Sequence, residues 1–192
     1  MKLPHFQAFT IGFQGTNTRI ITDVDVFPGF DPSKQPQPIP GRTVKALWDT
    51  GASGSVISHG VAADLQLVQT GTTIVQTAGG RQQSPTYLVN FGLPNRCGVA
   101  GIQATTIDDT HGFGAIIGMD VICLGDFSIT NVSGKTLMSF RTPSCEVVDY
   151  VRDANRMKYA GVARNAPCPC QKPGPDGRVP KFKHCCGKAI AQ

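Results

Sequence analysis

Long apolar runs are missing from this sequence. No window approaches about 18 unbroken apolar residues, the length that a membrane-spanning helix requires. The N-terminal segment Met1–Phe13 carries His5 and Gln7 where a secretory signal peptide needs its apolar run. We therefore expect a cytoplasmic protein without a membrane span.

Charged residues are also scarce, at 16% of the chain, whereas hydrophobic residues make up 40%. This balance permits a packed core and excludes wholesale disorder. The 22 glycines and 14 prolines divide the 192 residues into short segments, which favours strands and turns over long helices. The net charge of +5 is uneven, because residues 1–150 carry −2 and residues 151–192 carry +7. The chain thus combines a near-neutral body with a basic tail.

Alternation of apolar and polar residues predicts an all-β body. The predicted strands are residues 6–13, 19–27, 43–48, 72–76, 82–91, 98–107, 114–117, 127–130 and 136–140. Ser58 is expected to cap a short helix that continues through Asp64. A second helix is expected over Glu146–Ala160, with Val147 and Val151 at helical spacing. We predict a body at residues 1–145, a helical linker at 146–163 and a small tail module at 164–192.

The segment Ala46–Ser53 combines apolar strand residues with Asp49, Thr50 and Gly51, followed by small residues. The apolar residues bury the approach strand, so the acid emerges from a rigid support. Gly51 permits a tight turn. A bare Asp-Thr-Gly also occurs in ordinary turns, but the flanking residues favour a catalytic carboxylate at Asp49.

A second segment, Ala115–Asp120, contains two isoleucines before a glycine, and Ile116 lies 67 residues after Asp49. In order and spacing, residues 15–142 resemble the retropepsin-like aspartic proteases. The resemblance implies a closed barrel that forms one half of a homodimer and hydrolyses peptide bonds without a cofactor. It also implies that Asp49, Thr50 and Gly51 are catalytic. Peptide or protein substrate would be bound by Gly51 and by a flap that contains Ala78, Gly79 and Gly80.

Only one Asp-Thr-Gly is present, and the body is too short for a second lobe. Two chains must therefore meet so that their Asp49 carboxylates face each other. Like charges about 3 Å apart do not both ionise cheaply, so the pair shares one proton. One acid then activates water and the other stabilises the oxyanion. The alternatives are a non-enzymatic peptide-binding protein and an adaptor recruited through its tail.

The chain departs from the retroviral members at two positions. They usually carry an acid where this chain has Ser53 and an arginine where it has Met119. Those two residues pair with each other in that family, so the joint absence avoids a lone buried charge. The contact that supports the dimer must therefore be built differently here.

Four of the seven cysteines, Cys168, Cys170, Cys185 and Cys186, form two tight pairs in the tail. Such pairs can enclose a structural zinc ion, and a redox pair is the alternative. Arg164–Lys188 resembles the SEC-C zinc-binding motif, although its middle is longer than the family's and His184 is a possible replacement ligand. The basic tail is expected to dock on a protein, a ribosome or an acidic surface, or to be merely solvated.

The remaining candidates have weaker patterns. The scattered Cys97, Cys123 and Cys145 are interpreted as buried small hydrophobic residues. Beside Ser58, His59 suggests a nucleophile and base, but a helix cap explains Ser58 better. A loop with the acids of residues 108–109 and a histidine at 111 fits either a metal site or ordinary solvated turn residues.

Overall fold

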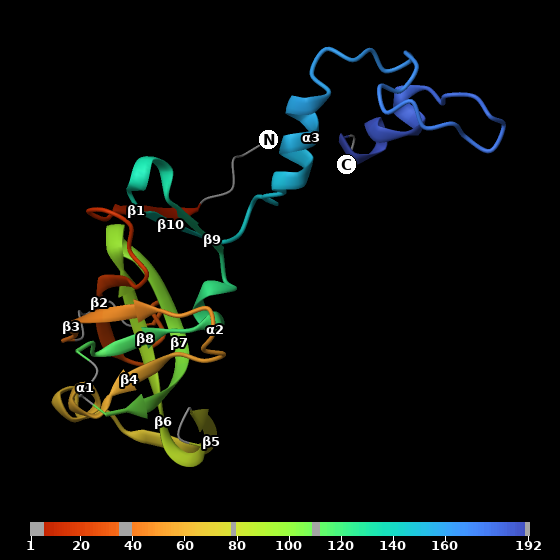
Figure 1. Ribbon diagram of the computed structural model, residues 1–192. Helices are drawn as coiled ribbons and strands as arrows, with labels where there is room; N and C mark the ends of the chain where they lie inside the picture. The colour runs from red at the N-terminus through yellow and green to blue at the C-terminus, as the bar shows by residue number, and fades with distance from the viewer. Residues whose placement is uncertain (1–5, 35–39, 78–79, 109–111, 191–192) are drawn as a thin grey trace. The chain divides into compact units, whose positions relative to one another are not determined.

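The computed structural model describes residues 6–34, 40–77, 80–108 and 112–190 (Figure 1). Contacts divide the chain into two compact units, Met1–Cys145 and Glu146–Gln192. Within the described ranges, no helix is both long and apolar enough to cross a membrane.

Unit 1 is built almost entirely of strands, which confirms the all-β prediction for the body. Its strands are β1 (Gln7–Gly12), β2 (Ile20–Pro28), β3 (Arg42–Trp48), β4 (Val56–Ser58), β5 (Gln69–Thr77), β6 (Gly80–Leu93), β7 (Cys97–Ile107), β8 (Ala115–Ile117), β9 (Asp126–Thr130) and β10 (Leu137–Thr142). Its helices are α1 (His59–Asp64), α2 (Met119–Ile122) and the short 3-10 turns η1 (Pro94–Arg96) and η3 (Val132–Gly134). Ser58 caps α1 as predicted, because its Oγ accepts the Val61 N–H at 3.2 Å.

The larger sheet closes on itself. Its strand order is β2-β3-β8-β4-β7-β6-β5, and β2 also pairs with β6. The closing contact aligns Asp25 with Gly92 and Pro28 with Val89. β5 remains outside this ring and pairs with the first half of β6. The predicted closed barrel is therefore present within one chain.

A smaller sheet, in the order β1-β10-β9, packs against the barrel through aromatic side chains. Trp48 at the end of β3 stacks on Phe127, with ring centroids 5.6 Å apart and planes 10° apart. Phe140 and Phe9 lie 5.5 and 5.9 Å from the same indole. Aromatic pairs at these separations add to the stability from burial alone. The smaller sheet thus holds the strand that delivers Asp49.

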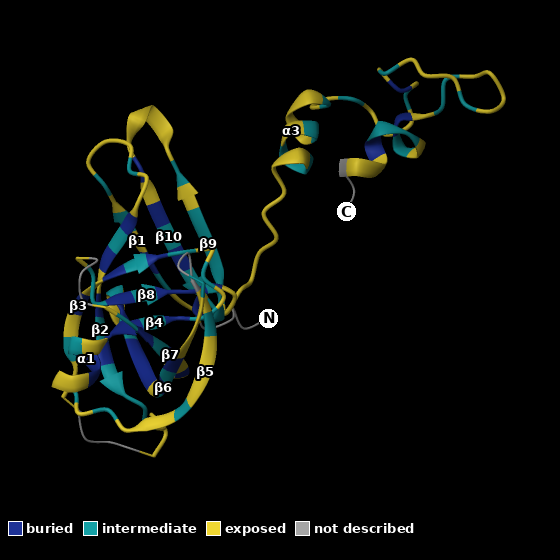
Figure 2. Cartoon of the chain, turned by 60° about the horizontal axis from the view of Figure 1, so that its bottom comes forward, coloured by how far each residue is buried: buried dark blue, intermediate teal, exposed yellow. Residues whose placement is uncertain are grey.

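The buried side chains form one core in unit 1. Figure 2 shows them along the barrel strands, whereas β5 is exposed over most of its length. Val26, Ile57, Val89 and Ile117 are fully buried. Burial of such side chains contributes roughly 1.5–3 kcal/mol each, so apolar packing supports the barrel.

Unit 2 contains α3 (Tyr150–Lys158) and two 3-10 turns, η4 (Phe182–His184) and η5 (Cys186–Ile190). The predicted helix is therefore shorter than Glu146–Ala160. It begins late because the Asp149 carboxylate accepts the Arg152 N–H at 3.0 Å and caps the helix there. Val147 lies outside the helix, and Val151 is 70% exposed, so the expected apolar face is not buried.

Candidate functional site

Asp49 directly follows β3, at a point where the barrel fixes the backbone. β3 runs parallel to β8, with Trp48 opposite Ile117. The Asp49 N–H donates to the Ile117 carbonyl at 3.0 Å, so the acid still belongs to the sheet. One residue earlier, the buried Trp48 Nε1–H donates to the Thr22 hydroxyl at 2.9 Å. The predicted rigid support for Asp49 is present.

Residues 49–52 form a tight turn around the carboxylate. Asp49 Oδ1 accepts the Gly51 N–H at 2.8 Å, and the Ala52 N–H donates to the Asp49 carbonyl at 3.2 Å. A Cβ atom at Gly51 would lie 3.1 Å from the same Oδ1, so glycine lets the backbone approach the acid closely. Asp49 is half-buried, while Thr50 and Gly51 are exposed. The turn presents one orientated carboxylate at the surface of the chain.

The predicted second segment lies against this turn. The Met119 N–H donates to the Ala52 carbonyl at 2.8 Å. A Cβ atom at Gly118 would stand 2.6 Å from backbone atoms of Gly54. No larger residue fits at position 118 without moving the loop. The short helix expected after the glycine is α2.

Sequence reasoning missed a polar clamp formed by Ser55 and Asp120. Ser55 is 1% exposed, and its N–H and Oγ–H donate to the two carboxylate oxygens of Asp120 at 2.9 and 2.7 Å. Ser55 Oγ also accepts the Gly118 N–H at 3.1 Å. This clamp ties the end of the Asp49 loop to the start of α2. The only sequence signal was a serine and an acid near the two recognised motifs.

The two departures from the retroviral pattern have ordinary environments. Ser53 is exposed. Met119 is partly buried and packs on the core. Neither side chain replaces the missing ion pair, whereas Ser55 and Asp120 bridge the same two segments. The loop is therefore attached to α2 by a serine–carboxylate pair instead of an ion pair.

The β5–β6 hairpin occupies the place of the expected flap. The two strands are antiparallel, and Thr77 aligns with Gly80 at the turn end of the hairpin. Gly80 has a φ of 109°, a conformation that L side chains rarely adopt. Ala78 and Gly79 lie outside the described residues. The hairpin confirms the predicted pairing, while the contacts of its tip with a substrate stay a prediction.

The other candidates do not form a catalytic group. Ser58 is buried and engaged as a helix cap. The His59 ring lies 3.8 Å from the Asp108 carboxylate, and both side chains are more than half exposed. The suggested metal loop also includes Asp109 and His111, which lie outside the described residues.

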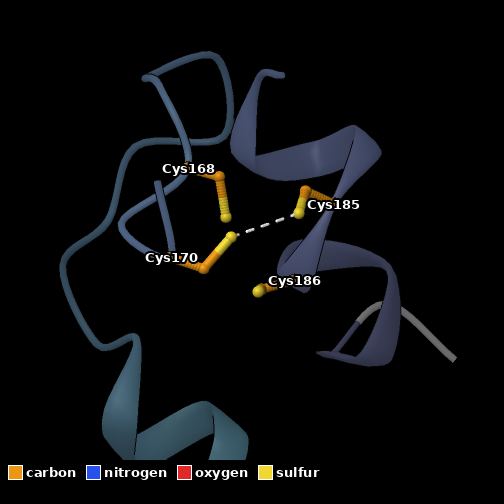
Figure 3. A group of neighbouring side chains, drawn as sticks. All are labelled: Cys168, Cys170, Cys185 and Cys186. Atoms are coloured by element: carbon orange, nitrogen blue, oxygen red, sulfur yellow. Dashed lines mark hydrogen bonds between the residues drawn. The ribbon is translucent and has the colours of Figure 1, made fainter. Parts of the chain in front are cut away.

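In unit 2 the four clustered cysteines face a common centre, as Figure 3 shows. Their ligand atoms all lie within 4.8 Å of one another, and Cys170 Sγ is 3.5 Å from Cys185 Sγ. Zinc–sulfur bonds of about 2.3 Å in a tetrahedron place sulfurs about 3.8 Å apart. The spacing thus fits a metal ion. His184 is exposed and outside this cluster.

Backbone contacts bring the two cysteine pairs together. The Cys168 N–H donates to the Pro180 carbonyl at 2.9 Å, and the Phe182 N–H donates to the Ala166 carbonyl at 2.7 Å. A Cβ atom at Gly187 would lie 2.6 Å from the Phe182 carbonyl oxygen, so glycine permits the close packing of η5 on η4. This small framework holds the thiols in place.

The thiols also share protons unequally. Burial alone would raise the pKa of Cys168, but hydrogen bonds from the backbone N–H groups of Cys170 and Cys186 lower that pKa to about 6. Hydrogen bonds with the Cys170 and Cys168 thiols raise the pKa of Cys185 to about 12. The cluster therefore stabilises negative charge on one sulfur, the form in which cysteine binds metal.

The three cysteines of the body do not all follow the prediction. Cys97 is buried, and this burial raises its thiol pKa. Cys123 and Cys145 are exposed, so their interpretation as buried hydrophobic residues is wrong. They follow the end of α2 and β10, where the chain leaves the core. All seven cysteines have free thiols.

No curated protein sequence matches the chain. Similar solved structures include the following three. A retropepsin-like aspartic protease from Rickettsia conorii is 13% identical, covers 74% of this chain and 99% of its own, and has a TM-score of 0.44. EIAV protease in complex with the inhibitor HBY-793 is 18% identical, with 57% and 90% coverage and a TM-score of 0.43. Simian foamy virus protease is 18% identical, with 53% and 91% coverage and a TM-score of 0.34.

A family model described as aspartyl protease matches residues 38–121. The matched segment contains the Asp49 turn, the β5–β6 hairpin and the Gly118 segment, but it ends before the cysteine cluster. The SEC-C resemblance of the tail therefore stays a prediction. The predicted enzyme class is confirmed by this match: an aspartic-type endopeptidase, a hydrolase of peptide bonds.

Proposed function

We propose that the chain is a homodimeric aspartic endopeptidase in which each subunit contributes Asp49 as its catalytic acid. The observation that carries this proposal is the position of the carboxylate. It is half-buried at the end of a sheet strand, and its loop is fixed by hydrogen bonds to Ile117, Met119 and Asp120. Catalysis requires a pre-organised acid of this kind.

A single Asp49 is not sufficient for the reaction. The sequence holds one Asp-Thr-Gly, and one oxygen of Asp49 already accepts the Gly51 N–H. A second copy supplies the other acid across a two-fold axis. The close pair then shares one proton. The ionised acid takes a proton from water as the water oxygen attacks the peptide carbonyl, and the protonated acid stabilises the oxyanion.

The substrate is proposed to be an extended peptide or protein segment. The Gly51 backbone is exposed beside the acid, and Thr50 is proposed to hydrogen-bond across the dimer axis. The flap, with Ala78, Gly79 and Gly80, would cover the peptide from the other side. β5 lies at the edge of its sheet and pairs with β6 on one side, which is the arrangement that permits backbone recognition of an added strand.

Replacement Asp49→Asn tests the catalytic role. It keeps the size of the side chain and removes the ionisable acid, so cleavage of an unfolded protein should fall at least about 100-fold. Asp31→Asn is the matched control, because Asp31 lies in an exposed loop and should leave turnover unchanged. Cleavage that persists in Asp49→Asn would refute the mechanism.

The oligomeric state tests the paired acids. Sedimentation should give about twice the chain mass for wild type and for Asp49→Asn alike. A wild-type protein that cleaves as a strict monomer would rule out the shared site. A dimer without turnover would favour the alternative, a peptide-binding protein or an adaptor.

The four cysteines of unit 2 are proposed to hold one structural zinc ion. Cys168, Cys170, Cys185 and Cys186 fill all four tetrahedral positions, which leaves no open position for catalysis. When bound, the ion would cross-link the two cysteine pairs. Four thiolates and one divalent ion carry −2, so the basic segment keeps an excess of positive charge.

Unit 2 is further proposed to be a docking module for a protein, a ribosome or another acidic surface. Its Lys181 and Lys188 are exposed, and residues 151–192 carry +7. Charge of this kind favours association with acidic partners and makes it dependent on salt. The free thiols, two of them exposed in the body, fit a reducing compartment, and we infer a cytoplasmic location.

A further inference from the structure

Tyr159 occupies the C-terminal cap position of α3, and α3 contacts η5, the turn that begins with Cys186. Its hydroxyl forms a hydrogen bond with the Cys186 side chain, and the charges of Cys168 and Cys170 also act on it. Its ring packs on Phe182 with centroids 5.3 Å apart and planes 53° apart. Tyr159 is half-buried, and nothing in the cysteine spacing alone predicts this contact.

We propose that Tyr159 is an outer-sphere hydrogen-bond donor to the Cys186 thiolate of the metal site, so that α3 belongs to the metal-binding module. This inference rests on the proposal that the four cysteines hold a metal ion. It assigns α3 a role different from that of a linker between two independent parts.

The chemistry of the ligands explains why a donor is useful there. Four thiolates leave the occupied site with a charge of −2, and donors near the sulfurs stabilise that charge. Cys168 already receives the backbone N–H groups of Cys170 and Cys186. The Tyr159 hydroxyl adds a donor at Cys186, on a different ligand.

Local structure fixes the tyrosine in this position. The Tyr159 N–H donates to the Asn155 carbonyl at 3.0 Å, and the Val162 N–H donates to the Tyr159 carbonyl at 3.1 Å. Phe182 is 7% exposed and supports the ring from the η4 side. The ring packing and the hydroxyl contact thus connect the end of α3 to η4, whose C-terminal cap residue is Cys185, and to η5, which begins with Cys186.

The hydroxyl should raise metal affinity at neutral pH. A metal-bound sulfur keeps partial negative charge, so a hydroxyl donor should stabilise the occupied site more than the empty one. Removal of a second-shell donor typically lowers metal affinity 10–100-fold. For a hydroxyl we expect a loss of about tenfold.

The test compares the full-length wild type with Tyr159→Phe, which keeps the ring that packs on Phe182 and removes only the hydroxyl. Zinc affinity is measured by competition with a chelator. Tyr150→Phe is the matched control, because Tyr150 is 71% exposed in the first turn of the same helix. We expect about a tenfold weaker affinity for Tyr159→Phe and an unchanged affinity for Tyr150→Phe.

Substitution with Co²⁺ gives a second readout that loss of packing alone does not move. Loss of a hydrogen bond raises the energy of the sulfur lone pair, so the sulfur-to-cobalt charge-transfer band of Tyr159→Phe should shift to longer wavelength. Hydrogen exchange over residues 150–158 should increase in wild type when the metal is removed, because α3 loses its attachment.

The outcomes separate the two proposals. A wild type that binds neither zinc nor cobalt overturns the metal site, and the tyrosine inference with it. A wild type that binds metal, with the same affinity and spectrum in Tyr159→Phe, overturns only the role of Tyr159. Equal losses in Tyr159→Phe and Tyr150→Phe would also overturn it, since the effect would then belong to the helix in general.

Discussion

The two units are stabilised by different means. Unit 1 has a continuous apolar core that runs through the barrel and the smaller sheet. In the described part of unit 2, the buried apolar residues are Cys168 and Phe182, and the helix α3 has no buried residue. A segment with so little apolar burial does not offset its conformational entropy without a cross-link. The comparison indicates that packing stabilises unit 1, whereas the proposed metal coordination would stabilise unit 2.

Removal of the metal should produce the largest difference in stability between the two units. Structural zinc sites of this size derive about 10–16 kcal/mol from metal binding, so a chelator should unfold residues 146–190 and leave the barrel intact. Hydrogen-exchange mass spectrometry of the full chain measures both units at once. Equal protection of unit 2 with and without chelator would show that it has another source of stability.

Truncation of a core side chain should destabilise unit 1 and leave unit 2 unchanged. Phe140 is 1% exposed and contacts Phe9 and Trp48, so Phe140→Ala should cost unit 1 about 3–5 kcal/mol. Urea denaturation measures this loss. The zinc affinity of unit 2 should not change, and a parallel loss of metal binding would contradict the independence of the two folding mechanisms.

A smaller effect is expected at the clamp beside the proposed active site. Ser55→Ala removes the hydroxyl that donates to Asp120 and leaves the Gly118 N–H without its partner, which should cost about 1–3 kcal/mol. Turnover should also decrease, because the Asp49 loop loses an attachment. Ser53→Ala is the control on the same loop, since Ser53 is exposed and its loss should stay within about 0.5 kcal/mol. Equal stability and turnover in the two variants would remove the clamp from the account.

Much of the barrel was predictable because its strands alternate and its turns carry glycine. The ranges expected for β2, β3, β6 and β7 lie within a few residues of those observed. β4 was missed, since Val56–Ser58 is too short to show a period. It becomes a strand only through its partners β7 and β8. Such tertiary pairing is not encoded in local sequence.

The site was predicted in part for a similar reason. The Asp49 turn and the Gly118 segment carry short, specific patterns, and the cysteine cluster follows from spacing. The Ser55–Asp120 clamp, the Trp48–Thr22 hydrogen bond and the Tyr159–Cys186 contact join residues far apart in the chain. Each depends on side-chain geometry that only the folded chain defines.

The hydrogen bonds between the Asp49 loop and Ile117–Asp120 also determine when this loop can become ordered during synthesis. Chains are made from the N-terminus, and a domain folds once its contacts are available. The acid is synthesised early, but its sheet partner and the Ser55 clamp emerge only with β8 and α2. A nascent chain that ends before these elements lacks the contacts that orient the Asp49 carboxylate. Under the proposed role of Asp49, the chain should therefore gain hydrolytic activity only after these later elements have been synthesised.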